Sequence, residues 1–156
     1  MGPRFDYQKA APKGAVQAMY GLEHYVRTCG LEHSLLHLLK TRASQLNGCA
    51  FCIDMHTKDA RAEGDTEQRL YALSAWRETP FYSDRERAAL EWTEAVTLIS
   101  QNNVPDELYE RVRKHFTEAE LVSLTLAVIA INGWNRLSIS FRVVPGTYQR
   151  PQSASA

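Results

Sequence analysis

The sequence predicts an all-α fold, a helical bundle of about seven helices. Two observations indicate it. Apolar residues recur at helical spacing between short breaks that contain glycine, proline or asparagine. No segment shows the sustained apolar–polar alternation that is typical of a β-strand. At 156 residues the chain is long enough for one domain with a sizeable core.

The first three helices are expected at residues 15–26, 31–46 and 49–62. Gly30 ends the first of them, and Gly64 follows the third. Between the second and the third lies Asn47-Gly48, a pair that commonly ends one helix and lets another begin. The sequence therefore places residue 49 at or near a helix start.

Four further helices are expected at residues 67–76, 84–100, 106–115 and 118–139. Capping-box patterns precede three of them, as Asp65 with Gln68, Ser83 with Glu86, and Thr117 with Glu120. Pro105 suits the first turn of the helix at 106–115. We assign residues 1–144 to a single helical domain and expect residues 145–156, which end Ser-Ala-Ser-Ala, to form a flexible tail.

Composition argues against several classes of partner. Lysine plus arginine equals aspartate plus glutamate, 18 each, so no basic excess indicates nucleic acid or an anionic membrane. The richest apolar run, residues 121–131, is too short to span a bilayer. The first residues lack the apolar core of a signal peptide. We therefore expect a cytoplasmic protein.

The segment from Gly48 to His56 carries the chemistry. Cys49 and Cys52 are separated by two residues, so a disulfide can close between them, and His56 lies one helical turn after Cys52. Unpaired backbone N–H groups in a first helical turn favour a thiolate. Cys52 is the expected attacking thiol because His56 is its neighbour. Cys49 is the expected resolving thiol, and an external dithiol must then restore the pair.

The dithiol leaves other interpretations open. Zinc sites use the same cysteine spacing, and Cys49, Cys52 and His56 would need one more ligand, which His33 or His37 could supply. Packing in an inert core is the third reading. The remaining cysteine, Cys29, is interpreted as a bystander at a helix end.

The dithiol and its surroundings resemble the carboxymuconolactone decarboxylase and AhpD-like alkylhydroperoxidase superfamily. The resemblance covers roughly residues 15–142 and is carried by residues 42–61, 69–71, 76–82, 86–95 and 131–136. It implies an all-helical protein that assembles as a homotrimer or homohexamer and reduces hydroperoxides. It also implies that Cys52 forms the sulfenic acid, that Cys49 is proton donor and resolving thiol, and that His56 belongs to a proton relay. The superfamily's decarboxylase branch lacks the dithiol.

Two positions depart from that pattern. The family usually has a glutamate twelve residues before the first cysteine, to polarise the relay histidine, and this chain has His37 there. Glu32 and Asp54 are possible substitutes for that carboxylate. Phe51 stands where the founding peroxidases have a histidine between the cysteines.

The sequence thus predicts a thiol peroxidase with Cys52, Cys49, His56 and His37 as site residues, and with no cofactor or metal. Its partners are a hydroperoxide substrate and a dithiol reductant protein. The alternative is a redox-sensing, disulfide-exchange or metal-binding module without significant turnover.

Overall fold

The computed structural model of the protein describes residues 2–150, and within that range it contains helices and no strand. This confirms the all-α class, with nine α-helices and one 3₁₀ helix in the described range where about seven helices were expected. The helices are α1 (Tyr7–Ala10), α2 (Ala15–Thr28), α3 (His33–Asn47), α4 (Ala50–Ala62), α5 (Glu67–Ala72), the 3₁₀ helix η1 (Leu73–Glu78), α6 (Asp84–Thr97), α7 (Ile99–Asn102), α8 (Asp106–Val112) and α9 (Glu118–Phe141).

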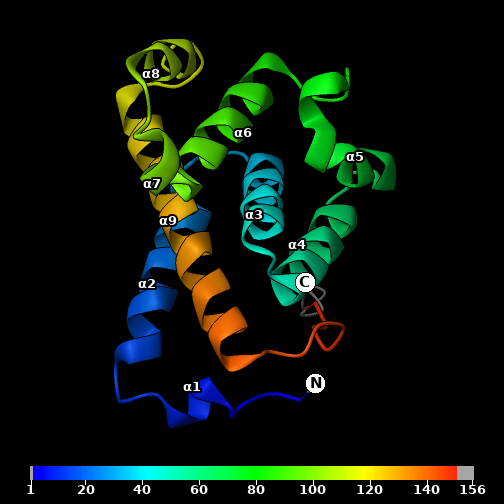
Figure 1. Cartoon of the computed structure of the whole chain (residues 1–156), viewed down its shortest axis with the longest axis vertical. Helices are drawn as coiled ribbons and strands as arrows, with labels where there is room; N and C mark the ends of the chain where they lie inside the picture. Colours follow the sequence, from blue (N-terminus) through cyan, green and yellow to red (C-terminus); the bar gives the residue numbers. More distant parts are fainter. Residues whose placement is uncertain (1, 151–156) are drawn as a thin grey trace, which may run out of the picture.

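Helix α3 lies at the centre of the bundle. It packs against α4 on one side and against α6 and α9 on the others, while α2 lies along α9 (Figure 1). Helices α6 and α8 pack together near the N-terminal end of α9. This arrangement brings the junction between α3 and α4 next to the C-terminal half of α9, which is where the two cysteines lie.

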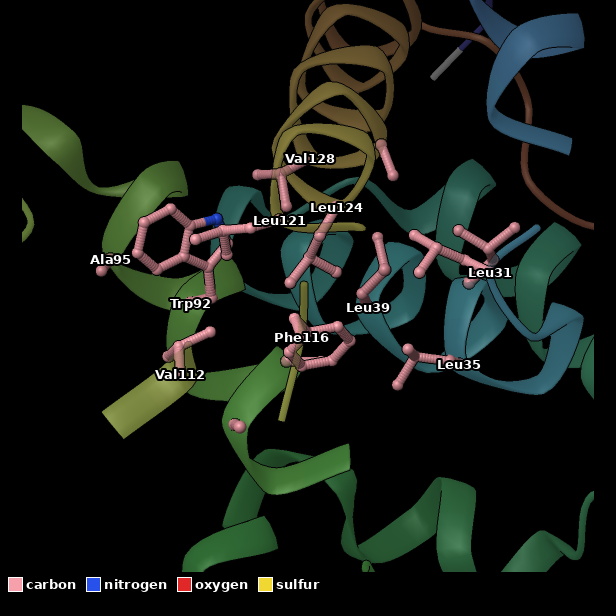
Figure 2. Close-up of a cluster of buried hydrophobic side chains, with 14 of the residues drawn as sticks. Leu31, Leu35, Leu39, Trp92, Ala95, Val112, Phe116, Leu121, Leu124 and Val128 are labelled. Atoms are coloured by element: carbon pink, nitrogen blue, oxygen red, sulfur yellow. The ribbon is translucent and has the colours of Figure 1, made fainter. Parts of the chain in front are cut away.

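The main core forms where α3, α6, α8 and α9 meet. Figure 2 shows Leu39, Trp92, Phe116 and Leu124 converging on one another from separate segments. The indole N–H of Trp92 donates to the Thr125 hydroxyl at 3.0 Å, so its polar atom is satisfied at the core boundary. A second, smaller buried cluster holds α5 and η1 against α3, α4 and α6, through Leu38, Ala60, Leu70, Leu73, Trp76, Tyr82 and Leu90.

Helix α9 matches the predicted helix at 118–139 to within two residues, and it extends beyond the apolar run at 121–131 in both directions. Its 24 residues are long and apolar enough, by length and composition, to cross a membrane. Its packing is nevertheless that of a core helix, because it contacts α2, α3, α4 and α6, and Asn135 lies on its fully buried face. Asn135 is satisfied there by hydrogen bonds to other side chains of the bundle.

Two predicted capping boxes are confirmed. Ser83 with Glu86 begins α6, and Thr117 with Glu120 begins α9, each with both reciprocal hydrogen bonds. The capping box predicted from Asp65 and Gln68 is wrong. The N-cap residue of α5 is Thr66, whose side chain accepts from the Arg69 N–H.

Three predicted helices are shorter than expected. Helix α8, predicted at 106–115, ends at Val112. The segment predicted as one helix at 67–76 divides into α5 and η1, with non-helical backbone angles at Ala75. Helix α6 ends at Thr97, because Leu98 leaves the helical conformation before the short α7 begins.

The chain after α9 returns along α4. Arg142, in a left-handed conformation, ends α9, and the backbone N–H of Gly146 then donates to Asp54 at 3.1 Å. Further on, Lys58 donates to the Tyr148 carbonyl at 3.3 Å, and the Tyr148 hydroxyl donates to Asp59 at 2.9 Å. Residues 145–150 of the predicted tail therefore lie against the helix that carries the dithiol. Residues 151–156 of that tail lie outside the described residues.

Truncation of a core residue tests the packing of α9. Leu124 is fully buried, so Leu124→Ala is expected to lower the free energy of unfolding by about 2–5 kcal/mol. Ile99→Ala is the matched control, because Ile99 is 54% exposed and its truncation is expected to cost roughly 0.5 kcal/mol or less. Urea denaturation followed by circular dichroism measures both. Equal losses in the two variants would contradict the assigned core.

Candidate functional site

A tight turn between α3 and α4 positions the two cysteines. Gly48 ends α3 with a φ of 71°, a left-handed conformation that glycine adopts without steric cost. The Cys49 N–H then donates back to the Ser44 carbonyl at 2.9 Å, which closes the end of α3. Helix α4 begins at the next residue, so the predicted Asn47-Gly48 break is found where it was expected.

Asparagine side chains of α9 tie this turn to the core. The Asn47 amide donates to Asn132 at 3.0 Å and to Asn135 at 2.9 Å, and the Asn135 amide donates to the Ser44 hydroxyl at 3.0 Å. These bonds join the last turn of α3 to the middle of α9. The bond between Asn135 and Ser44 is buried, and the two bonds from Asn47 are partly buried.

Both cysteines are buried at the N-terminus of α4. Cys49 is the N-cap residue, and its sulfur accepts from the Cys52 backbone N–H at 3.4 Å. The two residues are joined by a disulfide with a Cα–Cα distance of 5.4 Å. Cys52 lies in the first helical turn, where the helix dipole and free N–H groups stabilise a thiolate once the disulfide is reduced.

His56 lies one turn after Cys52 and is buried with it. Burial lowers the pKa of His56 well below its ordinary value, and the positive charge of Lys40 and the His37 ring lower it further. At neutral pH the ring is therefore uncharged, with one nitrogen available to accept a proton. The Nδ1 atom is buried and has no hydrogen-bond partner in the described part of the chain.

His37 reaches the site from α3. Its ring lies 6.4 Å from the His56 ring, measured between centroids, so the structure brings the fourth predicted site residue beside the third. The Nε2 atom of His37 is 3.0 Å from a carboxylate oxygen of Glu63, at the C-terminal end of α4. The other oxygen of Glu63 accepts from Arg150 at 2.8 Å.

Glu63 is the carboxylate that the sequence did not identify. The two substitutes considered for the missing glutamate have other partners, since Glu32 pairs with Arg85, and Asp54 pairs with Lys58 and the Gly146 N–H. Glu63 is separated from His37 by 26 positions. Its only sequence signal is its position two helical turns beyond His56 on the same helix.

Lys40 adds a buried cation near the histidines. Only 5% of this residue is exposed, and its ammonium forms a salt bridge with Glu23 of α2. Pairing of this kind is what allows a lysine to remain charged in a buried position.

A cleft of about 510 Å³ connects these groups to the surface. Cys52, His56 and His37 all line it. Its other titratable lining residues are Glu23, Arg27, His33, Lys40, Asp59, Glu63 and Arg150, and its apolar and aromatic ones are Tyr7, Tyr20, Leu36, Phe51, Met55, Trp134 and Tyr148. The cleft can therefore admit a small organic molecule to the sulfur of Cys52.

Two remaining expectations concern thiols and metals. Cys29 is half-buried at the end of α2 and donates to the Val26 carbonyl at 3.1 Å, away from the lining of the cleft. Across residues 2–150, no group of three or more histidine, cysteine, aspartate or glutamate residues is placed to hold a metal ion.

Comparison with known proteins adds three findings. Residues 13–95 match the profile of the Carboxymuconolactone decarboxylase family. The uncharacterised protein YdfG of Bacillus subtilis (strain 168) is 51% identical over 140 residues, which span 90% of this chain and 95% of that protein. The uncharacterised protein YnjA of Escherichia coli (strain K12) is 34% identical over 104 residues, which span 67% of this chain and 54% of that protein.

The fold also matches a solved structure closely. ATU0492 of Agrobacterium tumefaciens, a protein of unknown function described as a candidate antioxidant defence protein AhpD, superposes with a TM-score of 0.90 at 46% identity. The match covers 94% of this chain and all of that one. The arrangement of helices around the dithiol is therefore AhpD-like.

The buried, uncharged His56 makes stability depend on pH. An unfolded histidine takes up a proton below about pH 6.5, whereas folded His56 resists protonation until a lower pH. Below about pH 6.5 the unfolded state therefore binds more protons than the folded state. His56 alone is then expected to lower the free energy of unfolding by about 1.4 kcal/mol for each unit by which the pH falls. Urea denaturation of the oxidised protein between pH 7.5 and 5 measures the slope, and His56→Gln should reduce it. An unchanged slope in that variant would contradict a buried neutral ring.

Proposed function

Because the chain belongs to the carboxymuconolactone decarboxylase family and has an AhpD-like fold, we propose that it is a thiol-dependent peroxidase. The observation that carries this proposal is the placement of Cys52. Its sulfur lies at a helix N-terminus, beside a partner thiol, one turn from a neutral histidine, and on the wall of an open cleft.

The chemistry uses each of these groups. His56 accepts the Cys52 proton, and the thiolate attacks the O–O bond of a hydroperoxide. Sulfur takes up the hydroxyl oxygen as a sulfenic acid, and the alkoxide that leaves receives a proton from His56. The Cys49 thiol then attacks the sulfenic sulfur, which releases water and forms the disulfide. An external dithiol reductant protein, in the cytoplasm, restores both thiols.

A redox-sensing or disulfide-exchange module is the second candidate. One observation favours it, because His37 stands where the family usually has the glutamate that polarises the relay histidine. Such a protein would form its disulfide readily but would turn over peroxide slowly.

Peroxide consumption separates the two candidates. We expect the reduced protein, supplied with excess dithiothreitol, to consume an organic hydroperoxide with turnover, and Cys52→Ser to abolish it because the attacking sulfur is gone. Cys29→Ser is the matched control, since Cys29 lies outside the lining of the cleft, and it should retain full activity. No turnover in the unaltered protein, with the disulfide still forming, would support the second candidate.

We further propose that the protein assembles as a homotrimer or homohexamer. Support comes from large apolar side chains exposed along α9, namely Val122, Ile129 and Ile139, which a soluble monomer would leave in water. Light scattering at micromolar concentration should give three or six times the 17.7 kDa mass of one chain. A monomeric mass would contradict the assembly.

A further inference from the structure

The two histidines of the cleft share an unusual feature. The Nδ1 atoms of His37 and His56 are both buried without a hydrogen-bond partner in the described residues, although the rings are neighbours. A buried polar nitrogen without a hydrogen-bond partner lowers the stability of the fold. Two of them on neighbouring rings, in the cleft that Cys52 also lines, call for a functional explanation.

Glu63 determines which nitrogen of His37 carries the proton. A carboxylate oxygen accepts hydrogen bonds, so His37 Nε2, 3.0 Å away, is the protonated nitrogen and donates to it. In the neutral form of the His37 ring, with its proton on Nε2, the Nδ1 atom has a lone pair. That lone pair can only accept, which makes it a suitable partner for an N–H on the neighbouring ring.

The separation of the rings fits one bridging water. With centroids 6.4 Å apart, two ring nitrogens directed at one another would be roughly 4 Å apart, which is beyond a direct hydrogen bond and within the span of a single water. A water that donates to His37 Nδ1 and accepts from His56 Nδ1–H would satisfy both buried nitrogens. The Nε2 atom of His56 would then be the one with a lone pair.

We propose that Glu63 is a positioning residue of the thiol site, acting through His37 to hold His56 with its proton on Nδ1 and its Nε2 free to take the proton of Cys52. The inference rests on the proposed function. When His56 holds the Cys52 proton, the negative charge of Glu63, relayed through His37, stabilises the resulting imidazolium. Glu63 thereby supplies the charge that His37 itself lacks.

Other charged groups surround the two rings and must be controlled for. They are Glu23 and Arg27 from α2, His33 and Lys40 from α3, Asp59 from α4 and Arg150 from the C-terminal segment. Of these, Asp59 is the closest match to Glu63, because it is an α4 carboxylate on the same cleft. Both carboxylates pair with Arg150, but Asp59 accepts from the Tyr148 hydroxyl at 2.9 Å, whereas Glu63 accepts from His37.

The test measures the acidity of Cys52 without any peroxide. The reduced protein is alkylated with iodoacetamide from pH 5 to 10, and modification of Cys52 is followed by peptide mass spectrometry. We expect Glu63→Gln to raise the apparent pKa of Cys52 and to slow its alkylation at pH 7 about tenfold, because a pKa shift of one unit changes the thiolate fraction tenfold. Asp59→Asn should have a clearly smaller effect.

A double variant tests whether Glu63 acts on Cys52 through His37 or through its charge alone. In a His37→Gln background, Glu63→Gln should cause no further change, because Glu63 acts only through His37. Equal shifts in Glu63→Gln and Asp59→Asn, or additive shifts in the double variant, would overturn the proposal.

The result for Glu63 can also be told apart from the result for the proposed peroxidase activity. Altered Cys52 acidity in Glu63→Gln, in a protein that consumes no peroxide, would leave Glu63 assigned and refute the peroxidase. If the protein consumes peroxide but the pH profile of Cys52 alkylation is the same in Glu63→Gln and Asp59→Asn, the peroxidase stands and the role of Glu63 is refuted.

Discussion

The turn from α3 into α4 is the constraint on which the rest of the site depends. Gly48 takes a left-handed conformation there, and hydrogen bonds between the half-buried Asn47 and the buried Asn135 fix the turn to α9. The direction of α4 follows from that fixed start. Cys52 therefore faces the cleft at a helix N-terminus, and His56 falls one turn behind it, with no further device needed to bring thiol and base together.

Burial then sets the electrostatics of the site. A histidine removed from water, with Lys40 close by, is held uncharged, and an uncharged ring serves as a base only if its free nitrogen faces the thiol. Control of the tautomer becomes the chemical requirement. In the relay that we propose, the pairing of His37 with Glu63, which also accepts from Arg150, supplies that control.

Local patterns in the sequence were enough to predict the helices and the dithiol. The capping boxes at Ser83 and Thr117, the Asn47-Gly48 break and the Cys49–Cys52 spacing each depend on residues a few positions apart, and the structure confirms them. The split between α5 and η1 could not be predicted, because the 67–76 segment has no glycine or proline to mark it.

The surroundings of the dithiol depend on contacts between distant residues. Glu63 is 26 positions from His37, and Arg150 is a further 87 positions along the chain from Glu63. No periodicity or motif reports such pairs, so the sequence pointed to Glu32 and Asp54 instead. The C-terminal segment along α4 was missed for the same reason, since its polar composition carries no packing signal and its order comes from hydrogen bonds to Asp54 and Asp59.

The most direct test of the central claim is chemical trapping at the attacking sulfur. Reduced Cys49→Ser protein, which cannot form the disulfide between residues 49 and 52, is mixed with one equivalent of an organic hydroperoxide in the presence of dimedone. Mass spectrometry then locates the adduct. If Cys52 is the nucleophile of a peroxidase, the adduct forms on Cys52 within one turnover and in near-stoichiometric yield. An adduct confined to Cys29, or the absence of any adduct while hydroperoxide persists, would contradict that account.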